Sequence, residues 1–490
     1  MSKTFQQALQ DGLFPVGTEI VAPRGVQCPA QSASLKLAKE LLSDERVNYV
    51  SITDNPGGNP MLPPDWLAGQ LADYAPNVIV HLACKDFNRA GLESQLWRYA
   101  SEGFENVLVL TGDLPADGFP SQSGSVFDYD SVNLLSMMTA MNAGLPVKNR
   151  RGQPETLPRV NFFAGCAVNP FKYSENEFVP QLAKLLKKVK AGAKWVIPQL
   201  GYDMQRFKEV KLFLEQQGFN VPFIGNAFVL TKGIAKLIKS GKLAGCVVSD
   251  SLLADIEKYA TGADKGKVFF KELAAKQIAV FRGLGFAGTH IGGIEKPETF
   301  FEIIDLSKTF ENDWQTLYEE IQYRQQPAAS ARKKKHVSLF YRFSRLVHAA
   351  AFHRGHGLYP LIKRSYRFLE SGKYRFLPSV LHGIEYHSKN VLYNCTDCGD
   401  CGLPDTAYLC PMNRCSKNQR NGPCGGSNNG RCEADDKPCI WTLAYDRLKC
   451  FNEWREFEDK PPIVYNAALK GTSAWANLYL DRDHSAADNG

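Results

Sequence analysis

Short apolar runs alternate with longer segments of helical periodicity through the first 300 residues. The runs are rich in β-branched and aromatic side chains, which is typical of buried strands. We expect strands at residues 17–23, 48–54, 77–83, 106–112, 159–167, 195–201, 222–229 and 285–293. Helical spacing lies between them, notably at residues 34–42, 92–102, 178–191 and 204–217. Eight strand–helix units predict an α/β fold, a (β/α)8 TIM barrel over residues 1–310, with its chemistry at the C-terminal ends of the strands.

A connecting segment follows at residues 311–380. Residues 311–326 read as a helix ending at Pro327, and residues 328–335 as a small, polar, basic linker. Residues 337–369 then mix aromatic and basic side chains at helical spacing. One apolar stripe is expected there, made of Leu339, Phe340, Phe343, Leu346 and Val347. We expect this stripe to pack on the barrel or on the next domain; docking of an acidic partner and binding to a membrane surface are the alternatives.

The net charge of +7 is local rather than global. Residues 331–383 contain twelve Lys or Arg side chains against one acid, Glu370, so the rest of the chain sums to −4. This distribution argues against a nucleic-acid-binding protein with a broad basic face. It marks residues 331–383 as a candidate surface for binding a partner of opposite charge.

Bulk composition is that of an ordinary globular protein, with 44% apolar and 22% charged residues in a chain of 490. No uninterrupted apolar stretch of about 20 residues occurs, and the first residues lack the layout of a secretion signal. We therefore expect a soluble, cytoplasmic protein. No glycine fingerprint for a dinucleotide follows any expected strand, which makes a Rossmann fold a weak interpretation.

Nine of the thirteen cysteines lie between Cys395 and Cys450, in a third expected domain at residues 381–490. The first four follow the pattern C-x2-C-x2-C-x8-C-P, and thiolates at such intervals suit an iron–sulfur cluster or zinc. Eight thiolates serve two centres, and Cys450 is left over. The candidate metal ligands are Cys395, Cys398, Cys401, Cys410, Cys415, Cys424, Cys432 and Cys439. We expect one [4Fe–4S] cluster at the first four, with zinc or unmetallated thiols as alternatives. For the other four, a second cluster and zinc both remain open.

Polar residues recur in or just after the expected strands. Thr53 and Asp54 close the second strand and Asp113 follows the fourth. His81, Gln199 and His290 lie within the third, sixth and eighth. Glu19 lies within the first, where an acid that points into a barrel mouth is costly unless it is used or paired. Glu19 is therefore a candidate general acid with a raised pKa; the alternative is an internal ion pair with Arg24.

Several motifs in order resemble methylenetetrahydrofolate reductase over roughly residues 10–300. They are Thr18-Glu19 with Pro23-Arg24-Gly25, then VSITDN at 50–55, HLACKDFNRAGL at 81–92 and LTGDLP at 110–115. The match continues with FDYDSV at 127–132, Asn169-Pro170-Phe171, Lys188 with Ala191-Gly192-Ala193, and Gln199 with Asp203.

This resemblance implies a flavoprotein barrel that reduces methylenetetrahydrofolate by hydride transfer from the flavin. By position, Glu19 matches the acid that protonates N10 of the folate, and Asp113 the catalytic aspartate beside pterin and flavin. Asp113 and Gln199 match substrate-contacting positions. The positions implied to bind the flavin are Thr53, Asp54, His81, Asp86, Asn88, Arg89, Thr111, Gly112, Asp128 and Lys188.

Some residues depart from the best-known bacterial pattern of this family. Thr111 replaces a common arginine, Gly165 and Asn169 replace a common aromatic residue and histidine, and residues 54–64 differ from the NADH-using enzymes. FMN in place of FAD is therefore open, as is direct use of NADH.

The tail also resembles a known module, the Cys-rich C-terminal module that accompanies some bacterial reductases of this family. The likeness rests on CTDCGDCGL, CP, NGPCGGS and GRCE, followed by Cys439, Trp441 and Tyr445. It implies electrons arriving through iron–sulfur chemistry, from a ferredoxin-like protein or from NAD(P)H. The basic segment would suit an acidic ferredoxin. A homo-oligomer is expected.

Three other functions remain open from the residues. One is a pterin-dependent methyltransferase with a zinc–thiolate site. Another is an NAD(P)H-using reductase with a structural zinc domain. The third is a non-enzymatic electron-transfer or scaffolding subunit, against which the joint presence of Glu19, Asp113 and Gln199 argues.

Overall fold

Eight parallel strands form one curled sheet, and each overlaps one of the eight runs expected to be strands. They pair in the order β8-β7-β4-β3-β2-β1-β10-β9. A parallel bridge from Val196 in β8 to Phe223, just before β9, joins the two outer strands. The sheet therefore curls into the predicted α/β TIM barrel. Its strands are β1 (Val16–Ile20), β2 (Tyr49–Ile52), β3 (Val78–Ala83), β4 (Asn106–Leu110), β7 (Phe163–Val168), β8 (Trp195–Pro198), β9 (Ile224–Phe228) and β10 (Gly288–Gly292).

The computed structural model describes residues 3–116, 121, 123–243, 245–325, 338–371 and 376–489. The chain divides into two units. The first unit contains Met1–Phe127, Leu134–Tyr173 and Lys188–Pro327, and the second contains Asp128–Asn133, Ser174–Lys187 and Ala328–Gly490. The expected linker at 328–335 lies outside the described residues.

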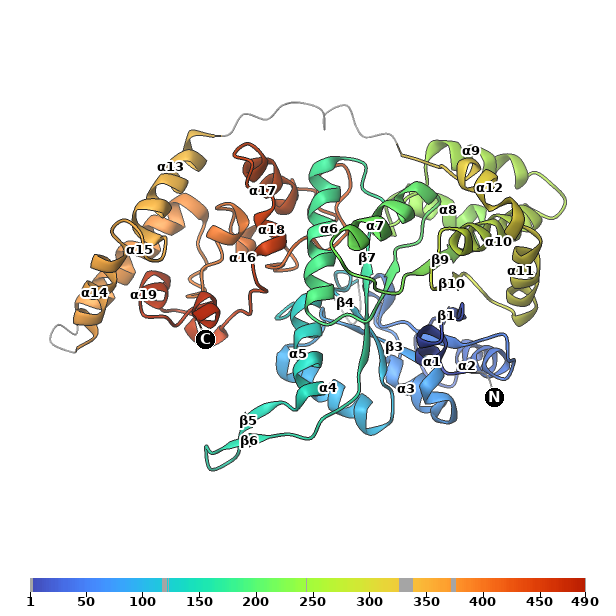
Figure 1. Ribbon diagram of the computed structural model, residues 1–490, viewed down its shortest axis with the longest axis horizontal. Coiled ribbons are helices and arrows are strands. Elements are labelled where there is room, and N and C mark those ends of the chain that lie inside the picture. Colours follow the sequence, from blue (N-terminus) through green and yellow to red (C-terminus); the bar gives the residue numbers. More distant parts are fainter. Residues whose placement is uncertain are drawn as a thin grey trace. The chain divides into compact units, whose positions relative to one another are not determined.

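Helices alternate with the strands along the barrel sequence, and Figure 1 shows α2, α3, α10 and α11 around the strands. Short 3-10 turns are η1 (Pro56–Gly58), η2 (Ala72–Asn77) and η3 (Glu311–Asp313). The helices are α1 (Phe5–Gln10), α2 (Pro29–Leu42), α3 (Pro64–Gly69), α4 (Arg89–Ser101), α5 (Ser131–Ala143), α6 (Glu175–Lys190), α7 (Met204–Gln216), α8 (Lys232–Lys239), α9 (Asp250–Tyr259), α10 (Lys267–Gly283), α11 (Pro297–Thr309) and α12 (Trp314–Glu320).

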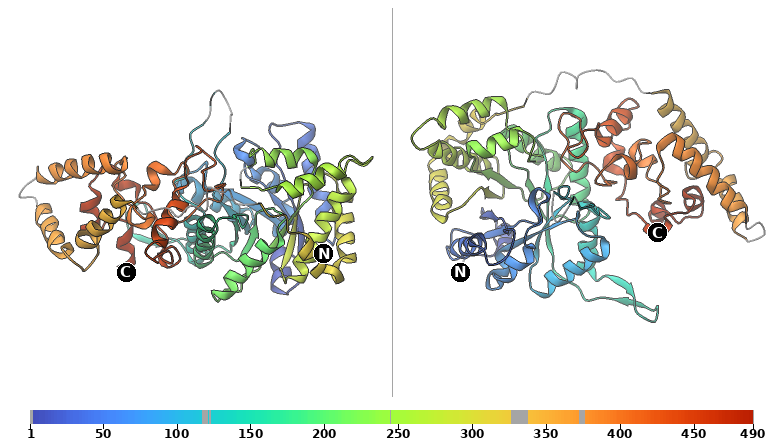
Figure 2. Two further views of the ribbon diagram at one scale, coloured as in Figure 1. Left: turned by 90° about the horizontal axis from the view of Figure 1, so that it is seen from above. Right: turned by 180° about the vertical axis from the view of Figure 1, so that it is seen from behind.

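An antiparallel hairpin that was not expected from the sequence interrupts the alternation of barrel strands and helices. It pairs β5 (Pro146–Lys148) with β6 (Pro154–Thr156) and projects away from the barrel strands (Figures 1 and 2). Its residues are mostly exposed, so no alternation of apolar side chains marks it in the sequence.

The helix expected at 311–326 is shorter than predicted. It begins as the 3-10 turn η3 and α12 ends at Glu320. The amide of Met204 then donates to the carbonyl of Ile321, and Gln322 forms a bridge with Asp203. Pairing with another segment therefore replaces the last helical turns.

The second unit contains further helices and short turns. They are α13 (Leu339–Val347), the π turn η5 (His348–Phe352), α14 (Tyr359–Glu370), α15 (Leu377–Tyr393), η6 (Pro404–Thr406), α16 (Pro411–Arg414), α17 (Ile440–Lys449), α18 (Glu456–Asp459), η7 (Ala467–Leu469), α19 (Ala474–Tyr479) and η8 (His484–Asn489). The helical segment expected at 337–369 is therefore broken after α13. Gly355 and Gly357, with φ of 77° and 56°, provide the left-handed backbone of this break.

The apolar stripe expected on this segment does not pack as predicted. Leu339, Phe343 and Leu346 are 83%, 59% and 68% exposed. The opposite side of α13 is the packed one, because the Ser344 hydroxyl lies 2.9 Å from that of Tyr393. Tyr341, also on that side, is buried. Amphipathic spacing predicted the helix correctly, but the prediction of its buried face was wrong.

A second hydrophobic core lies around α17 and includes part of α6. Ile440, Trp441, Ala444 and Tyr445 of α17 pack with Ala183 of α6. Hydrogen bonds support this packing: the Tyr445 hydroxyl donates to Glu175 at 2.6 Å, and Lys184 donates to Gln419 at 2.7 Å. All of these residues belong to the second unit. Among the described helices, none combines the length and apolar character that crossing a bilayer requires.

Aromatic side chains fill the N-terminal end of the barrel. Tyr49 and Trp195, the first residues of β2 and β8, pack with Phe5 of α1 at ring-centroid distances of 4.7 and 5.3 Å. Gly165 in β7 makes room for this group, because a Cβ atom there would lie 2.2 Å from the Trp195 ring. The apolar plug leaves the C-terminal end of the strands for polar chemistry.

We predict that Gly165→Ala destabilises the barrel by about 1–3 kcal/mol, because the added methyl group overlaps the buried Trp195 ring. Gly69→Ala is the matched control, since a Cβ atom at Gly69 in α3 meets nothing within 4 Å. The control should be neutral or stabilising by up to about 1 kcal/mol. Urea unfolding of both variants measures the difference, and equal stability of the two would contradict this packing.

Candidate functional site

Glu19 is a half-buried carboxylic acid near the C-terminal end of β1. Burial raises its pKa, so the protonated form persists to higher pH than in an ordinary glutamate. Gly292 on the neighbouring strand β10 leaves space for it, because a Cβ atom there would lie 3.3 Å from Glu19 Oε1. Among the described residues no cation forms an ion pair with Glu19. The alternative partnership with Arg24 is therefore absent.

Three buried polar atoms on adjacent strands have no hydrogen-bond partner within the part of the chain that the structure describes. They are Ser51 Oγ, Thr53 Oγ1 and His81 Nε2. Ser51 lies in β2 directly opposite Glu19 in β1. Buried polar groups normally have partners, so unsatisfied atoms grouped near strand ends indicate that a ligand supplies them.

Two buried histidines of the barrel are neutral. Burial, together with nearby His290, lowers the pKa of His81 to about 3. Burial lowers the pKa of His290 to about 4, and its Nδ1 lies 3.3 Å from the Tyr49 hydroxyl. Both imidazoles therefore offer one donor and one acceptor at neutral pH, without a charge.

The loops after β2, β3 and β4 are tied to one another by carboxylates. The Ala83 amide donates to Asp54 at 2.9 Å, and the Gly57 amide donates to Asp113 at 3.0 Å. Asp86 forms an ion pair with Lys85 at 2.5 Å and also accepts from Asn55. Burial raises the pKa of Asp54 to about 6. These acids fix the loops at the C-terminal end of the strands.

Other predicted site residues also have local structural contacts. Lys188 donates to the Ala167 carbonyl at 2.6 Å, and Gln199 accepts from the Leu200 amide at 2.9 Å. Asn88 caps α4 by accepting from Gly91, and Arg89 is the first residue of that helix. Thr111 and Gly112 follow β4, and Gly112 has the left-handed φ of 91°.

Asp128 belongs to the second unit, unlike the other predicted flavin contacts.

Sequence reasoning missed Ser51. Its signal was its spacing: Ser51 and Thr53 lie two residues apart, so their side chains share one face of an extended chain.

The eight candidate cysteine ligands fall into two groups. Burial raises the pKa of Cys410 to about 11, and neighbouring Cys401 and Cys398 raise it further. Burial likewise raises the pKa of Cys439 to about 12, with Cys424 and Cys415 nearby. Burial and nearby cysteines of the same group likewise raise the pKa values of Cys395, Cys398, Cys415 and Cys432. The first group is Cys395, Cys398, Cys401 and Cys410. The second group is Cys415, Cys424, Cys432 and Cys439. Cys450 is exposed.

Two cations approach the first group. Arg420 lowers the pKa of Cys398, against the larger effect of burial. Lys389 is buried, which lowers its pKa, but Cys401 and Glu385 outweigh this effect and raise it overall. These positive charges are suited to stabilise thiolates or a negatively charged metal cluster.

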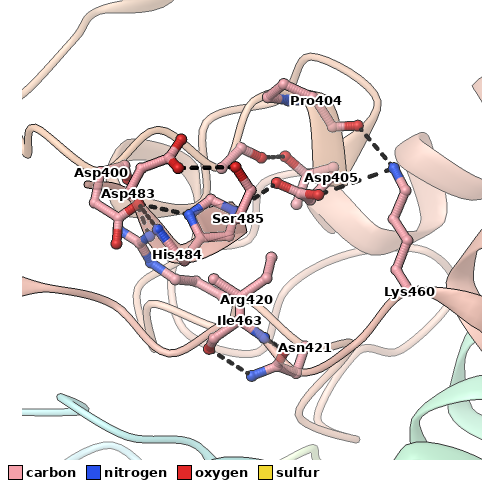
Figure 3. Close-up of polar contacts among 12 residues, drawn as sticks. Asp400, Pro404, Asp405, Arg420, Asn421, Lys460, Ile463, Asp483, His484 and Ser485 are labelled. Carbon is pink, nitrogen blue, oxygen red and sulfur yellow. Dashed lines mark hydrogen bonds and ion pairs between the residues drawn. The ribbon is translucent and has the colours of Figure 1, made fainter. Parts of the chain in front are cut away.

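Asp400 ties the loop between Cys398 and Cys401 to the end of the chain (Figure 3). Its carboxylate accepts from the Asn466 amide at 2.8 Å and lies 2.5 Å from His484 Nδ1. Although burial opposes it, pairing with Asp400 and Asp405 raises the pKa of His484 to about 10. Ligand atoms of Asp400, Asp483 and His484 lie within 4.8 Å of one another. With His484 protonated, the trio forms an ion-pair network.

Family models match both parts of the chain. The model described as methylenetetrahydrofolate reductase covers residues 4–308, and the model described as methylene-tetrahydrofolate reductase C terminal covers residues 374–465.

Curated relatives match parts of this chain. Methylenetetrahydrofolate reductase (NADH) 1 of Arabidopsis thaliana is 32% identical over 32% of this chain and 26% of its own length. Methylenetetrahydrofolate reductase 2 of Schizosaccharomyces pombe is 25% identical over 36% and 26%. A probable methylenetetrahydrofolate reductase (NADPH) of Caenorhabditis elegans is 23% identical over 44% and 31%. The chain thus spans about a quarter to a third of the length of these relatives.

A solved structure also matches, an uncharacterized protein from Clostridium thermocellum that binds two copies of 5-methyl-5,6,7,8-tetrahydrofolic acid. It is 12% identical, with a TM-score of 0.45, over 63% of this chain and 99% of that protein. The likeness is too low to carry a structural argument. The family model, by contrast, covers more than half of the chain and the whole barrel sheet. The chain belongs to the methylenetetrahydrofolate reductase family.

Proposed function

We propose that this protein is a flavin-dependent methylenetetrahydrofolate reductase that converts 5,10-methylenetetrahydrofolate to 5-methyltetrahydrofolate. The observation that carries the proposal is the half-buried acid Glu19, which has no described counter-ion and lies opposite Ser51, one of the unsatisfied polar residues near the C-terminal end of the barrel strands. An oxidoreductase of this family needs a proton donor of this kind. The Cys-rich segment is proposed to carry one or two iron–sulfur clusters that pass electrons to the flavin.

The residues fit a flavin, FAD or FMN. Ser51, Thr53 and His81 offer unsatisfied hydrogen-bonding atoms to a ring with polar edges, and neutral His81 can donate or accept. The flavin, when bound, supplies a hydride to the one-carbon unit. The other residues of the first unit proposed to hold it are Asp54, Asp86, Asn88, Arg89, Thr111, Gly112 and Lys188.

Glu19 is proposed to donate its proton to N10 of the folate. The bond between N10 and the methylene carbon then breaks, which leaves a cationic iminium at N5, and the hydride added to that carbon completes the methyl group. A raised pKa lets the acid keep its proton to higher pH than an ordinary glutamate does, which favours general acid catalysis. Asp113 and Gln199 are proposed to orient the pterin, since both lie just after strands of the barrel.

Nearby charge supports an iron–sulfur cluster at the first cysteine group. The cations Lys389 and Arg420 near this group suit the negative charge of such a cluster.

The electron donor is proposed to be an acidic, ferredoxin-like protein, with NAD(P)H as the alternative. The basic segment provides a complementary field for such a protein. Its described cations include Arg342, Arg364 and Arg367; the Lys and Arg residues at 332–335 lie outside the described residues. Stoichiometric flavin in the purified protein would set aside the methyltransferase alternative, which needs none.

Glu19→Gln should lower turnover of methylenetetrahydrofolate by about 10²–10⁴-fold, because glutamine cannot donate the proton. Flavin content should stay the same. The exposed acid Glu45 provides a matched control, and Glu45→Gln should leave turnover unchanged. Steady-state kinetics with a chemical reductant makes the measurement independent of the natural donor. Unchanged turnover in Glu19→Gln would refute the proposed acid.

The same pair of proteins should differ in pH dependence. Because burial raises the pKa of Glu19, wild-type turnover should persist to higher pH than an ordinary glutamate would allow and fall as pH rises through that pKa, where the acid loses its proton. The residual activity of Glu19→Gln should lack this fall. A profile of kcat/KM from pH 5 to about 10 checks the prediction. The same alkaline fall in both proteins would assign it to another group.

Single cysteine substitutions should separate the two groups. Cys395→Ala should lose the iron of the first group, and Cys424→Ala that of the second, because each removes one of four proposed ligands. Cys450→Ala, the exposed control, should retain all iron. Iron, zinc and acid-labile sulfide are quantified on anaerobically purified protein. Zinc without iron in the wild type would eliminate the electron-relay part of the proposal and leave the barrel chemistry intact.

A further inference from the structure

A cavity of about 850 Å³ lies within the second unit, and none of the residues proposed for folate chemistry is among its lining residues. Residues of α13, η5 and α15 line one side, and residues 401–408 and α19 line others. Its volume is in the range of sites for cofactors and other small molecules, about 300–1,000 Å³. Cys401 of the first cysteine group is among the lining residues.

Several aromatic rings contribute to the lining. Phe340 lies 5.4 Å from Tyr393, Tyr341 lies 5.8 Å from Tyr408, and Phe352 lies 5.8 Å from Trp475, measured between ring centroids. All six residues line the cavity. Aromatic side chains at such distances offer faces and edges to a further planar ring.

The cations around the cavity are already neutralised by acids. Arg345 pairs with Glu453, Lys389 with Glu385 and Lys460 with Glu456. Arg354 pairs with Asp481 at 3.0 Å. Of the described lining residues, none offers an unpaired Lys or Arg to a phosphate. This arrangement disfavours nucleotides, including phosphate-bearing flavins, because a buried anion needs a partner.

Two hydrogen-bond donors in the lining are suited to an acceptor atom that carries no charge. Arg354 Nε is buried and has no hydrogen-bond partner in the described part of the chain. Burial, with Lys460 and His353 nearby, lowers the pKa of His348 to about 4, so its imidazole is neutral and carries one N–H donor. Ring carbonyl oxygens would accept from such donors.

Three apolar side chains line the cavity and are also exposed to solvent. They are Phe343, Val347 and Leu392, which are 59%, 37% and 50% exposed. Apolar surface at the mouth of a cavity suits an apolar substituent that extends outward from the bound ring.

We propose that this cavity binds an uncharged, planar aromatic ligand of the quinone class, with its ring among the aromatic side chains and an apolar tail at the opening. Two ring carbonyls match the donors His348 and Arg354, and the paired charges exclude anionic ligands. The inference goes beyond the proposed function and does not depend on flavin or folate binding. The ligand would lie beside the first cysteine group, because Cys401 borders the same space.

Isothermal titration of the oxidised, full-length protein with duroquinone tests the proposal. This fully substituted quinone does not add to thiols. The wild type should bind one molecule per chain. Ala349→Trp should weaken binding at least about tenfold, because Ala349 lines the cavity and tryptophan occupies its space. Ala350→Trp is the matched control: Ala350 is exposed on the same π turn and does not line the cavity.

Flavin content and folate turnover are measured on the same preparations, so that failure in the barrel is distinguished from failure at the cavity. If Ala349→Trp does not fold, His348→Leu takes its place and should also weaken binding through loss of the N–H donor. Absence of duroquinone binding to the wild type overturns the proposal, as does equal binding by the cavity variant and its control. Displacement of duroquinone by FMN also overturns the proposal, because it would show that the cavity accepts a phosphate group.

Discussion

Burial of a carboxyl group without a counter-ion is the constraint on which the candidate site depends. Desolvation favours the neutral form of Glu19, and no described cation offsets it. Such a position costs stability, and the apolar core at the other end of the barrel offsets that cost. Phe5, Tyr49 and Trp195 close the N-terminal end, so burial extends to the residues above them. The same dry environment leaves Ser51 and His81 with unsatisfied atoms and keeps the histidines neutral. One packing arrangement therefore produces both the proton donor and the binding atoms.

The cysteine loops depend on a different interaction. They have little regular structure, and their glycines and short turns cannot hold sulfur atoms in place alone. The buried Asp400 carboxylate fixes the first loop through His484 and the Asn466 amide. His484 gains a proton from this pairing, so the network stays charged at neutral pH. The end of the chain is thus a structural part of the metal-binding region that the sulfur spacing predicts.

Much of the fold followed from local patterns. The eight strands are short apolar runs, and the periodicity of such runs is the strongest local signal in a sequence. Strand ends were less well predicted, because Asp54 and Gly112 continue the run in sequence but form loops. The exposed hairpin at β5 and β6 has no apolar alternation to reveal it. The pairing of Asp400 with His484 joins residues 84 positions apart, which no local pattern encodes.

The residues of the candidate site likewise differ in how well local sequence patterns reveal them. Glu19, Thr53 and His81 were identified because polar residues at barrel strand ends are poorly explained by packing, whereas Ser51 was passed over as an ordinary strand residue. The stripe of α13 shows the limit of periodicity: spacing reveals that a helix is amphipathic, but tertiary contacts decide which side is buried. On α13 the hydrogen bond between the Ser344 and Tyr393 hydroxyls and the ion pair between Arg345 and Glu453 determine the packed side.

The second unit contains two candidate binding regions, which differ in how their positively charged side chains are paired. Near the first cysteine group, Arg420 acts directly on Cys398, so negative charge on sulfur is stabilised there. Around the adjacent cavity, Arg345, Arg354 and Lys460 are each held by an acid. A ligand with a phosphate would have to break one of these pairs and leave a carboxylate without its partner, whereas an uncharged ring leaves them intact. Selectivity for neutral ligands thus follows from ion pairs that form before any ligand arrives, and the aromatic lining then supplies the attraction.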